Sequence, residues 1–294
     1  MEKETAKYIT YPKFVFLCGK ALDGSEYDTS NRGIVDNFIT RLSNDTFIVL
    51  SEKLWEDNFN SNIDLLTFEE FLAEISDCIV LFVESPGSFC ELGTFSYANK
   101  LFGDKLVVVV DERFKNKKSF IMTGPVLKAK KDGAEVVFAS LEGNGLLSSK
   151  NLRNTLQMRI EHFDSKSINL NKRLINKDES KVYINSFIIE LLELIKIAQP
   201  ITQEDLLELY KTVKAFTAFS FVKRDGSKFN TEIKISYIIK LLETVKLINV
   251  KDNVITTIHY KKAQGFMLKY YGNAESKERN RLICRKYRYM GIVE

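Results

Sequence analysis

Cysteine and histidine are scarce in this chain of 294 residues, which contains four cysteines and two histidines. Cys18, Cys78, Cys90 and Cys284 lie far apart, and no two of them form a CxxC pair. Structural zinc sites need clustered Cys or His ligands, and a disulfide framework needs closely spaced cysteines. We therefore expect no metal site and no disulfide framework.

Long apolar runs are also missing. The longest ones, Cys78–Val83 and Leu106–Val110, fall far short of the roughly 20 residues that cross a bilayer. The N-terminal stretch MEKETAKYITYPK lacks the apolar core of a secretory signal peptide. The sequence thus predicts a soluble protein of the cytoplasm with no membrane partner.

Glycine-rich phosphate-binding motifs are absent too. Gly19, Gly24 and Gly33 do not have the spacing of GxGxxG, and the pattern GxxxxGK[ST] does not occur. These motifs bind the phosphates of dinucleotide cofactors and of nucleoside triphosphates. We therefore expect no bound cofactor, so NAD or another nucleotide could enter only as a substrate.

Charge is nearly balanced over the whole chain, with 43 Lys and Arg against 39 Asp and Glu. The balance hides a split, because residues 1–150 carry 17 basic and 23 acidic side chains, whereas residues 151–294 carry 26 basic and 16 acidic ones. Residues 261–294 alone hold nine Lys and Arg. Two halves of opposite charge are expected to contact different partners.

Short β-branched and aromatic runs alternate with amphipathic stretches in the first half of the chain. Helices are expected over Ile34–Leu42 and Leu65–Ile75, where apolar residues recur at helical spacing. This alternation predicts an α/β domain over residues 1–145 with a Rossmann-like or flavodoxin-like parallel sheet, whose ligands bind at the carboxyl ends of the strands. The expected strands are Lys13–Cys18, Thr46–Leu50, Cys78–Val83, Lys105–Val110 and Glu135–Ala139.

The second half has a different pattern. Residues 146–177 are polar and helical, which predicts a helical linker. Helices are then expected within Ser180–Ile197, after a cap at Thr202, and over Thr231–Val245. Two short strands are expected within Lys246–Tyr260. Helices followed by a hairpin predict a winged helix-turn-helix domain over residues 178–294.

The stretch Glu84–Gly93, ESPGSFCELG, follows the most apolar of the expected strands. Pro86–Gly87 ends that strand, Ser88 can cap the next helix, and Glu91 then falls at the third helical position, as in a capping box. The same carboxylate would lie at the positive end of the helix, which favours its ionised form, and at the ligand-binding edge of the sheet. An ionised carboxylate that faces a ribose can act as a nucleophile.

Other residues at this edge are candidates for substrate binding. Gly19 follows Cys18 at the end of the first strand, and a glycine there lets a substrate approach the backbone closely. The amides of Gly87–Phe89 and the hydroxyl of Ser88 can hold an anion at the helix start. Glu84 is expected either to bind a sugar hydroxyl or to be a surface acid of the loop.

Four separated blocks agree in order and spacing with one protein family. They are FLCG at residues 16–19, Ser76-Asp77 before the third strand, ESPGSFCELG, and KNKKSFIMTGP at residues 115–125. Together they resemble the toxic effectors of certain retron anti-phage systems, whose N-terminal domain is similar to nucleoside 2-deoxyribosyltransferases. The resemblance covers residues 13–127 well, and the rest of the chain only in its order of helices and wing.

The resemblance implies catalytic roles for two carboxylates. Glu91 would attack the anomeric carbon of a ribosyl group and expel the base through an oxocarbenium-like state. Glu69, eight residues before Asp77, would orient the sugar hydroxyls or Glu91, although Glu at this position departs from the Asp of the wider group. Ser85 takes the place of a phosphate-contacting Ser in nucleotide-cleaving relatives, which suits a nucleotide better than a free nucleoside.

The implied activity is that of an N-glycosidase that hydrolyses NAD or another nucleotide and acts as an anti-phage toxin. NAD is favoured because its cationic nicotinamide leaves without a general acid. The implied partners are a reverse transcriptase and the multicopy single-stranded DNA/RNA hybrid that it makes, which restrain the toxin, and the effector is expected to form a homo-oligomer or a higher assembly. Two alternatives stay open, a deoxyribosyltransferase with a base as acceptor and a nucleotide-sensing winged-helix transcription regulator.

Basic residues flank the expected wing and continue in the tail, with Tyr287 and Tyr289 between them. Winged helices place one helix in a groove and use basic residues on phosphates. A solvated surface and a docking surface for a protein are the alternatives to nucleic-acid contact. The expected contact residues are Lys246, Lys251, Lys261, Lys262, Arg285, Lys286 and Arg288.

Overall fold

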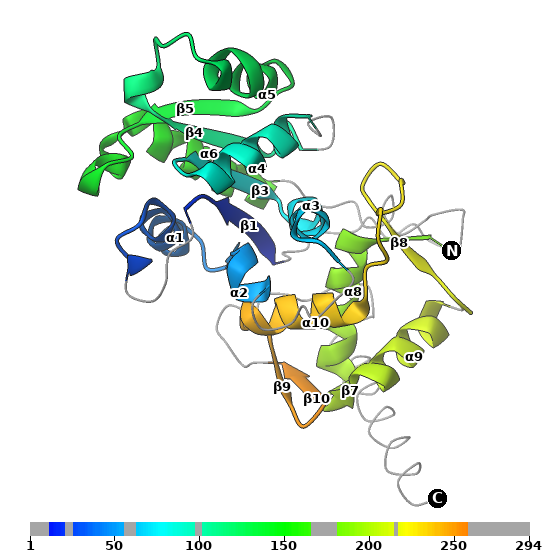
Figure 1. Cartoon of the computed structure of the whole chain (residues 1–294). Helices are drawn as coiled ribbons and strands as arrows, with labels where there is room; N and C mark the ends of the chain where they lie inside the picture. The colour runs from blue at the N-terminus through cyan, green and yellow to red at the C-terminus, as the bar shows by residue number, and fades with distance from the viewer. Residues whose placement is uncertain are drawn as a thin grey trace, which may run out of the picture. The chain divides into compact units, whose positions relative to one another are not determined.

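The structure, a computed structural model, describes residues 12–20, 26–55, 63–97, 102–165, 181–214 and 217–257. The chain divides into two compact units, an N-terminal unit over Lys13–Lys166 and a C-terminal unit from Ser167 on. Each unit has its own sheet and its own set of helices (Figure 1).

A five-stranded sheet forms the centre of the N-terminal unit, in the order β2-β1-β3-β4-β5. Every neighbouring pair in it is parallel. All five strands expected from the sequence are present, and each bound lies within one residue of its expected place. The strands are β1 (Lys13–Cys18), β2 (Thr46–Val49), β3 (Cys78–Val83), β4 (Leu106–Asp111) and β5 (Glu135–Ala139).

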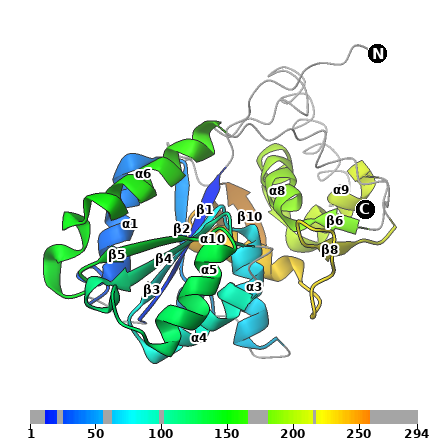
Figure 2. The same cartoon turned by 90° about the horizontal axis from the view of Figure 1, so that it is seen from above.

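Helices cover both faces of this sheet, as in a Rossmann-like fold. Figure 2 shows α1 and α6 on one face and α3, α4 and α5 on the other. The helices are α1 (Asn31–Leu42), α2 (Ser51–Trp55), α3 (Leu65–Ile75), α4 (Pro86–Tyr97), α5 (Leu127–Lys131) and α6 (Lys150–Ser165). Short turns of helix lie between them at η2 (Glu112–Phe114), η3 (Met122–Val126) and η4 (Gly143–Ser148).

The strands are apolar throughout because both of their faces are covered. In β1, Val15 and Leu17 pack in one core cluster with Val35 and Ile39 of α1. Phe16 points to the opposite face, where its ring lies 6.3 Å from that of Phe95 in α4. This double coverage explains why the strands are continuous apolar runs rather than alternating ones.

Helix α6 belongs to the N-terminal unit, although the sequence pattern predicted a linker over residues 146–177. Leu152, Leu156 and Ile160 recur every four residues and join the same core cluster as Val15 and Leu17. The spacing puts these three side chains on one helix face, which the sheet buries. The compact unit therefore extends to Lys166 rather than to residue 145.

The C-terminal unit is built around α8 (Ile184–Ala198), which is buried along most of its length. An antiparallel sheet has the order β7-β10-β9, and β6 pairs with β8 in a parallel two-stranded sheet. The remaining elements are β6 (Lys181–Tyr183), β7 (Ile201–Thr202), α9 (Gln203–Lys214), β8 (Ser220–Val222), α10 (Ile235–Thr244), β9 (Ile248–Lys251) and β10 (Val254–Thr257).

Two local expectations in this unit are confirmed. The Thr202 hydroxyl accepts a hydrogen bond from the Asp205 amide at 3.1 Å and caps α9. Strands β9 and β10 form a hairpin around Asp252 and Asn253, which both have positive φ. Asp and Asn tolerate this conformation, and a two-residue loop of this kind matches the twist of the strands.

The connection between α9 and α10 differs from a tight helix-turn-helix. Lys214 ends α9 and Ile235 begins α10, and β8 lies in the sequence between them. A helix-turn-helix joins its two helices by a turn of about 3–4 residues. The winged helix-turn-helix therefore stays a prediction, and the inserted segment is a feature that the sequence pattern did not indicate.

Among the helices that the structure describes, none has the length and hydrophobicity needed to cross a membrane.

The placement of α6 can be tested by substitution on its two faces. We expect Leu156→Ala to lower the free energy of unfolding by about 2–4 kcal/mol, because a side chain 1% exposed leaves a cavity. Met158→Ala on the same helix is the control, since this side chain is 68% exposed and its loss should change stability by no more than about 0.5 kcal/mol. Urea unfolding curves of the full chain measure both. Equal effects of the two substitutions would mean that α6 does not pack on the sheet.

Candidate active site

The carboxyl ends of β1 and β3 meet at the point where the connections of the sheet change direction. The chain leaves β1 for β2 at one edge, whereas it leaves β3 for β4 on the other side. In sheets of this type the crevice at such a point is the usual ligand site. Gly19, Glu84 and the start of α4 lie at this place.

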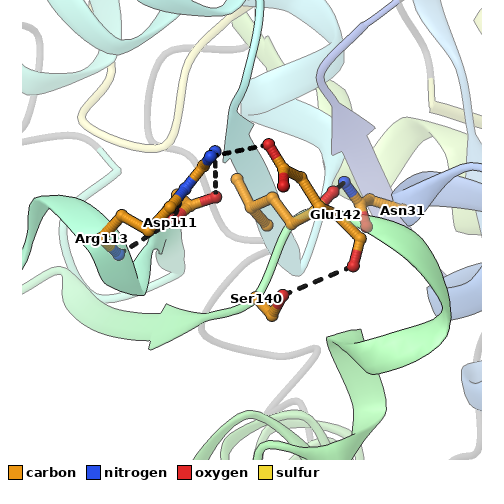
Figure 3. Close-up of polar contacts among 6 residues, drawn as sticks. Asn31, Asp111, Arg113, Ser140 and Glu142 are labelled. Atoms are coloured by element: carbon orange, nitrogen blue, oxygen red, sulfur yellow. Dashed lines mark hydrogen bonds and ion pairs between the residues drawn. The ribbon is translucent and has the colours of Figure 1, made fainter.

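Glu84 ties the loops at this edge together. Its carboxylate accepts hydrogen bonds from the Lys20 amide at 3.0 Å and from Asn31 Nδ2 at 2.5 Å. Asn31 also donates to the carbonyl of Leu141, which follows β5 (Figure 3). A Cβ added at Gly19 would lie 2.9 Å from the Glu84 carboxylate, so the glycine makes room for a protein side chain. These contacts give the half-buried Glu84 a structural role within the loops, which neither expectation for this residue included.

Helix α4 begins at Pro86, so Ser85 and not Ser88 is its cap. Ser85 Oγ accepts a hydrogen bond from the Ser88 amide at 3.2 Å, and proline suits the first helical position because its missing N–H has no partner to lose. This corrects the capping box of Ser88 and Glu91. Glu91 lies at the sixth helical position, in the second turn.

The buried Ser88 hydroxyl is fully occupied inside the protein. It accepts from the amides of Glu84 and Ser85, at 3.0 and 2.9 Å, and donates to the Ser85 carbonyl at 2.9 Å. A hydroxyl has one proton, so Ser88 has none left to donate to a substrate phosphate in this arrangement. Ser85 is half-buried and Gly87 is exposed, which leaves these two predicted residues at the surface of the helix start.

Glu91 of α4 and Glu69 of α3 are near enough for the charge of Glu69 to act on the pKa of Glu91. Both residues are half-buried. One carboxyl oxygen of Glu91, Oε2, is buried and has no hydrogen-bond partner among the described residues. The structure thus brings together the two residues to which catalysis was assigned.

One cation faces these carboxyls. Arg32, in the first turn of α1, is 2% exposed, and its Nη2 lies 2.6 Å from Glu52 Oε1 of α2. The contact is an ion pair without hydrogen-bond geometry, and Arg32 Nε has no hydrogen-bond partner in the described part of the chain. Its positive charge acts on Glu91 and on Cys18 and favours their ionised forms.

Burial raises the pKa of Glu91 to about 8, with the charge of Glu69 as the second cause, and Arg32 opposes the shift. Burial also raises the pKa of Glu69. At neutral pH the Glu91 carboxyl is therefore mostly protonated, so the two neighbouring carboxyls do not both carry a full charge. This contradicts the expectation that the helix start keeps Glu91 ionised, because Glu91 lies beyond the first turn and is withdrawn from water.

The thiol of Cys18 lies near the same carboxyls and is buried. Burial, followed by the charges of Glu91 and Glu69, raises its pKa well above the usual value. The neutral thiol at the end of β1 is thus part of the apolar floor beneath the pair. No group of three or more His, Cys, Asp or Glu side chains suited to a metal ion was found among the described residues.

A second polar group lies at the ends of β4 and β5. Asp111 accepts two hydrogen bonds from the Arg113 guanidinium, both at 2.9 Å, and Arg113 also pairs with Glu142 at 2.7 Å (Figure 3). Ser140 donates to the Glu142 carbonyl at 3.4 Å. These contacts hold the loops after β4 and β5 to each other.

The predicted nucleic-acid residues fall in two groups. Lys251 is exposed at the end of β9, and Lys246 is exposed two residues before its start, which makes both available to a partner. Lys261, Lys262, Arg285, Lys286 and Arg288 lie outside the described residues, and so does Cys284.

Sequence reasoning missed Arg32, Glu52 and Ser51. Arg32 begins the helix after β1, and Ser51 and Glu52 begin the helix after β2. Applying the rule of strand carboxyl ends to β2 as well as to β1 and β3 would have found all three.

The raised pKa of Glu91 predicts a pH-dependent gain of stability in Glu91→Gln. The folded protein binds the Glu91 proton more tightly than the unfolded chain does, so wild-type stability falls as pH rises from the unfolded pKa near 4.3 to about 8. Glu91→Gln has no titrating group at this position and does not lose stability in this way. We expect the free energy of unfolding of the variant, relative to that of the wild type, to rise by about 2–4 kcal/mol between pH 5 and pH 8.

Urea unfolding at pH 5, 6.5 and 8 measures this difference. The exposed Glu112 gives the matched control, Glu112→Gln, whose stability should follow the wild type at each pH. A constant difference between Glu91→Gln and wild type across this range would mean that Glu91 is ionised in the folded protein.

Two curated relatives each match about two fifths of the chain. The "Retron Ec86 putative ribosyltransferase/DNA-binding protein" of Escherichia coli is 39% identical over 125 residues, which cover 42% of this chain and 39% of the relative. The "Retron Ec73 putative ribosyltransferase/DNA-binding protein" of the same species is 36% identical over 118 residues, or 39% of this chain and 37% of the relative. The matches thus span less than two fifths of the length of these relatives.

A family model covers much more of the chain. The model described as STM3845 retron effector protein matches residues 28–250, which include Glu69, Glu91, the whole of α8 and α9, and the first three residues of β9. This match covers parts of both units and associates the protein with a retron. The chain belongs to the STM3845 retron effector family.

Proposed function

We propose that the N-terminal unit cleaves the N-glycosidic bond of NAD or a related nucleotide, with Glu91 as the nucleophile. The observation that carries the proposal is the pair of neighbouring carboxyls of Glu91 and Glu69 near the switch point of the sheet, with a buried Glu91 oxygen that has no hydrogen-bond partner among the described residues. Carboxyls with raised pKa values beside the cation of Arg32 are costly for stability, and such groups cluster at functional sites. The names of the curated relatives support ribosyl chemistry.

The proposed reaction has two steps. Glu69 takes the Glu91 proton, the Glu91 carboxylate forms a bond to the anomeric carbon, and the bond to the base breaks, with its electron pair leaving on the base. Water then attacks the anomeric carbon of the glycosyl–enzyme ester, loses a proton to the solvent, and releases the ribosyl product with Glu91 regenerated as the carboxylate. Arg32 stabilises the ionised form of Glu91 that begins the cycle.

The role proposed for Glu69 favours NAD as the substrate. Glycosidases with an acid and a nucleophile place their carboxyls about 5 Å apart or more, on different sides of the bond that breaks. In the proposed reaction Glu69 acts on Glu91, as its charge does on the Glu91 pKa, and is not assigned to protonate the leaving base. Nicotinamide needs no proton, because it leaves a positively charged ring nitrogen as a neutral molecule.

Base transfer and sensing are the rival functions. A transferase would use the same pair but would pass the sugar to a second base rather than to water. A sensor would bind the nucleotide unchanged. Incubation of the full chain with NAD, with and without added free bases, separates the three by whether ADP-ribose, a base-exchanged dinucleotide or intact NAD is recovered.

The C-terminal unit is proposed to contact nucleic acid. Its β9–β10 hairpin presents Lys246 and Lys251 on its surface, its half of the chain is basic, and the curated relatives carry DNA-binding in their names. The order α8, β7, α9, α10 and a hairpin is the order of a winged helix, with a longer connection before α10. The partners proposed for the effector are a reverse transcriptase and its RNA–DNA hybrid, which keep the toxin silent.

Glu91→Gln is expected to lower base release from NAD by about a thousandfold or more, because an amide cannot attack the anomeric carbon. The variant should stay folded and lose its toxicity in cells. Release of nicotinamide, followed by mass spectrometry at equal concentrations of folded protein, measures the loss. Glu112→Gln should keep the wild-type rate, and near-normal base release by Glu91→Gln would refute the proposal.

The pH dependence of the reaction tests how the pair works. We expect kcat/KM to rise with pH through an inflection near pH 8 and then to level off, since Glu91 must be ionised. Glu69→Gln removes the neighbouring charge and should move the inflection to lower pH by roughly one unit or more, together with a lower plateau. Arg32→Gln removes the cation and should move the inflection upward.

A purely structural role of either residue would lower the plateau without moving the inflection. Profiles recorded between pH 5.5 and 9.5 therefore distinguish the two explanations.

Exchange of both hairpin lysines, Lys246→Gln with Lys251→Gln, is expected to weaken binding of a DNA hairpin by the full chain. The slope of log K against log salt should fall by up to about two, one for each lost phosphate contact. Base release should not change. An unaltered slope would show that the hairpin does not contact phosphates.

A further inference from the structure

A cavity of about 670 Å³ opens in the C-terminal unit between α9, β8 and residues 228–236. Most of this wall is the segment that separates α9 from α10, where a helix-turn-helix has only a short turn. Its volume lies within the range of small-ligand sites, roughly 300–1,000 Å³. Neither the proposed chemistry nor the hairpin lysines use this space.

Aromatic rings line the cavity. Phe219, Phe221 and Phe229 are each half-buried and contribute to its walls. Behind them lie the buried rings of Phe187 and Tyr210, with Phe187 4.8 Å from Phe221 and Tyr210 5.4 Å from Phe219. The inner rings fix the outer ones, so the exposed ring faces are held in place before anything binds.

Three lysines surround these rings. Lys228 and Lys234 are exposed at the mouth, and Lys211 of α9 lies beside the cavity in an ion pair with Glu208. Glu232 is the acidic residue among those that line the space. The cavity therefore combines apolar ring faces inside with a net positive charge at its rim.

We propose that this cavity binds unpaired bases of a single-stranded nucleic acid. Bases stack on aromatic faces and lysines contact the adjoining phosphates, which is the combination used by proteins that bind single strands. Stacked bases in a duplex hide their faces, so a duplex can use the lysines but not the rings. An apolar peptide would use the rings but would gain nothing from the three lysines.

The proposal rests on the nucleic-acid contact proposed above and deepens it. In this proposal the cavity binds single strands, and Lys246 and Lys251 contact the phosphates of a duplex. Base release by the N-terminal unit is independent of it.

Three labelled probes test the proposal with the full chain. They are a 12-residue oligothymidylate, an abasic deoxyribose-phosphate strand of equal length and a DNA hairpin duplex. Oligothymidylate should bind about tenfold more tightly than the abasic strand, because each stacked base contributes to affinity. Phe219→Leu and Phe221→Leu should remove most of this difference while leaving the abasic strand unchanged.

Charge variants provide a second measurement that does not touch the packed rings. The double variant Lys228→Gln with Lys234→Gln should lower the affinity for both single strands and reduce the slope of log K against log salt by up to about two. Glu232→Lys should raise the affinity for both strands. Lys130→Gln, an exposed lysine of α5, is the control and should change neither.

Equal affinity for oligothymidylate and the abasic strand would overturn the proposal, as would Phe-to-Leu variants that bind both strands like the wild type. Binding of the duplex through the hairpin lysines alone would refute the cavity site but not the nucleic-acid contact. Failure of all three probes would refute both, whatever the rate of base release.

Discussion

The repulsion between the neighbouring carboxyl groups of Glu69 and Glu91, partly withdrawn from water, is the constraint on which the candidate site depends. Burial, followed by the charge of Glu69, raises the pKa of Glu91 to about 8, so Glu91 keeps at neutral pH a proton that an exposed glutamate loses. The positive charge of Arg32 partly opposes the rise in the pKa of Glu91, and Glu52 holds Arg32 in position through an ion pair. The apolar side chains of β1 and β3 exclude water beneath these groups. The reactivity proposed for Glu91 is therefore a property of the whole cluster rather than of one side chain.

The scaffold places the pair without any residue of the strands themselves. Glu69 and Glu91 come from α3 and α4, two helices on the same face of the sheet, while Arg32 comes from α1 on the other face and reaches the edge from its first turn (Figure 2). The parallel sheet makes this possible because all its strands end at one edge. A helix that follows any of these strands begins at this edge, so residues far apart in the sequence meet there.

Much of the N-terminal unit could be predicted from the sequence because its strands are buried on both faces and appear as continuous apolar runs. The bounds of β1, β3 and β5 follow directly from that pattern. The start of α4 could not be fixed by the same reasoning, since Ser85 and Ser88 are both competent caps and only the position of Pro86 separates them. The protonation of Glu91 depends on Glu69, which is 22 residues away in sequence, and no local pattern records that contact. The strands β6 and β8 are too short for a periodicity to show, and they form because they pair with each other.

Asn31 has a consequence for how this edge of the molecule can change. Its one amide group joins the carboxylate after β3 to the carbonyl after β5, and that same carboxylate accepts the amide after β1. The loops after β1, β3 and β5 are thus joined by three hydrogen bonds through Glu84 and Asn31. A change in the length or sequence of one loop that moves its partner atom breaks a hydrogen bond that also positions another loop. Replacement of one loop to change the specificity of the protein would therefore remove hydrogen bonds from the other loops. Replacement of all three loops together would preserve the hydrogen bonds among them.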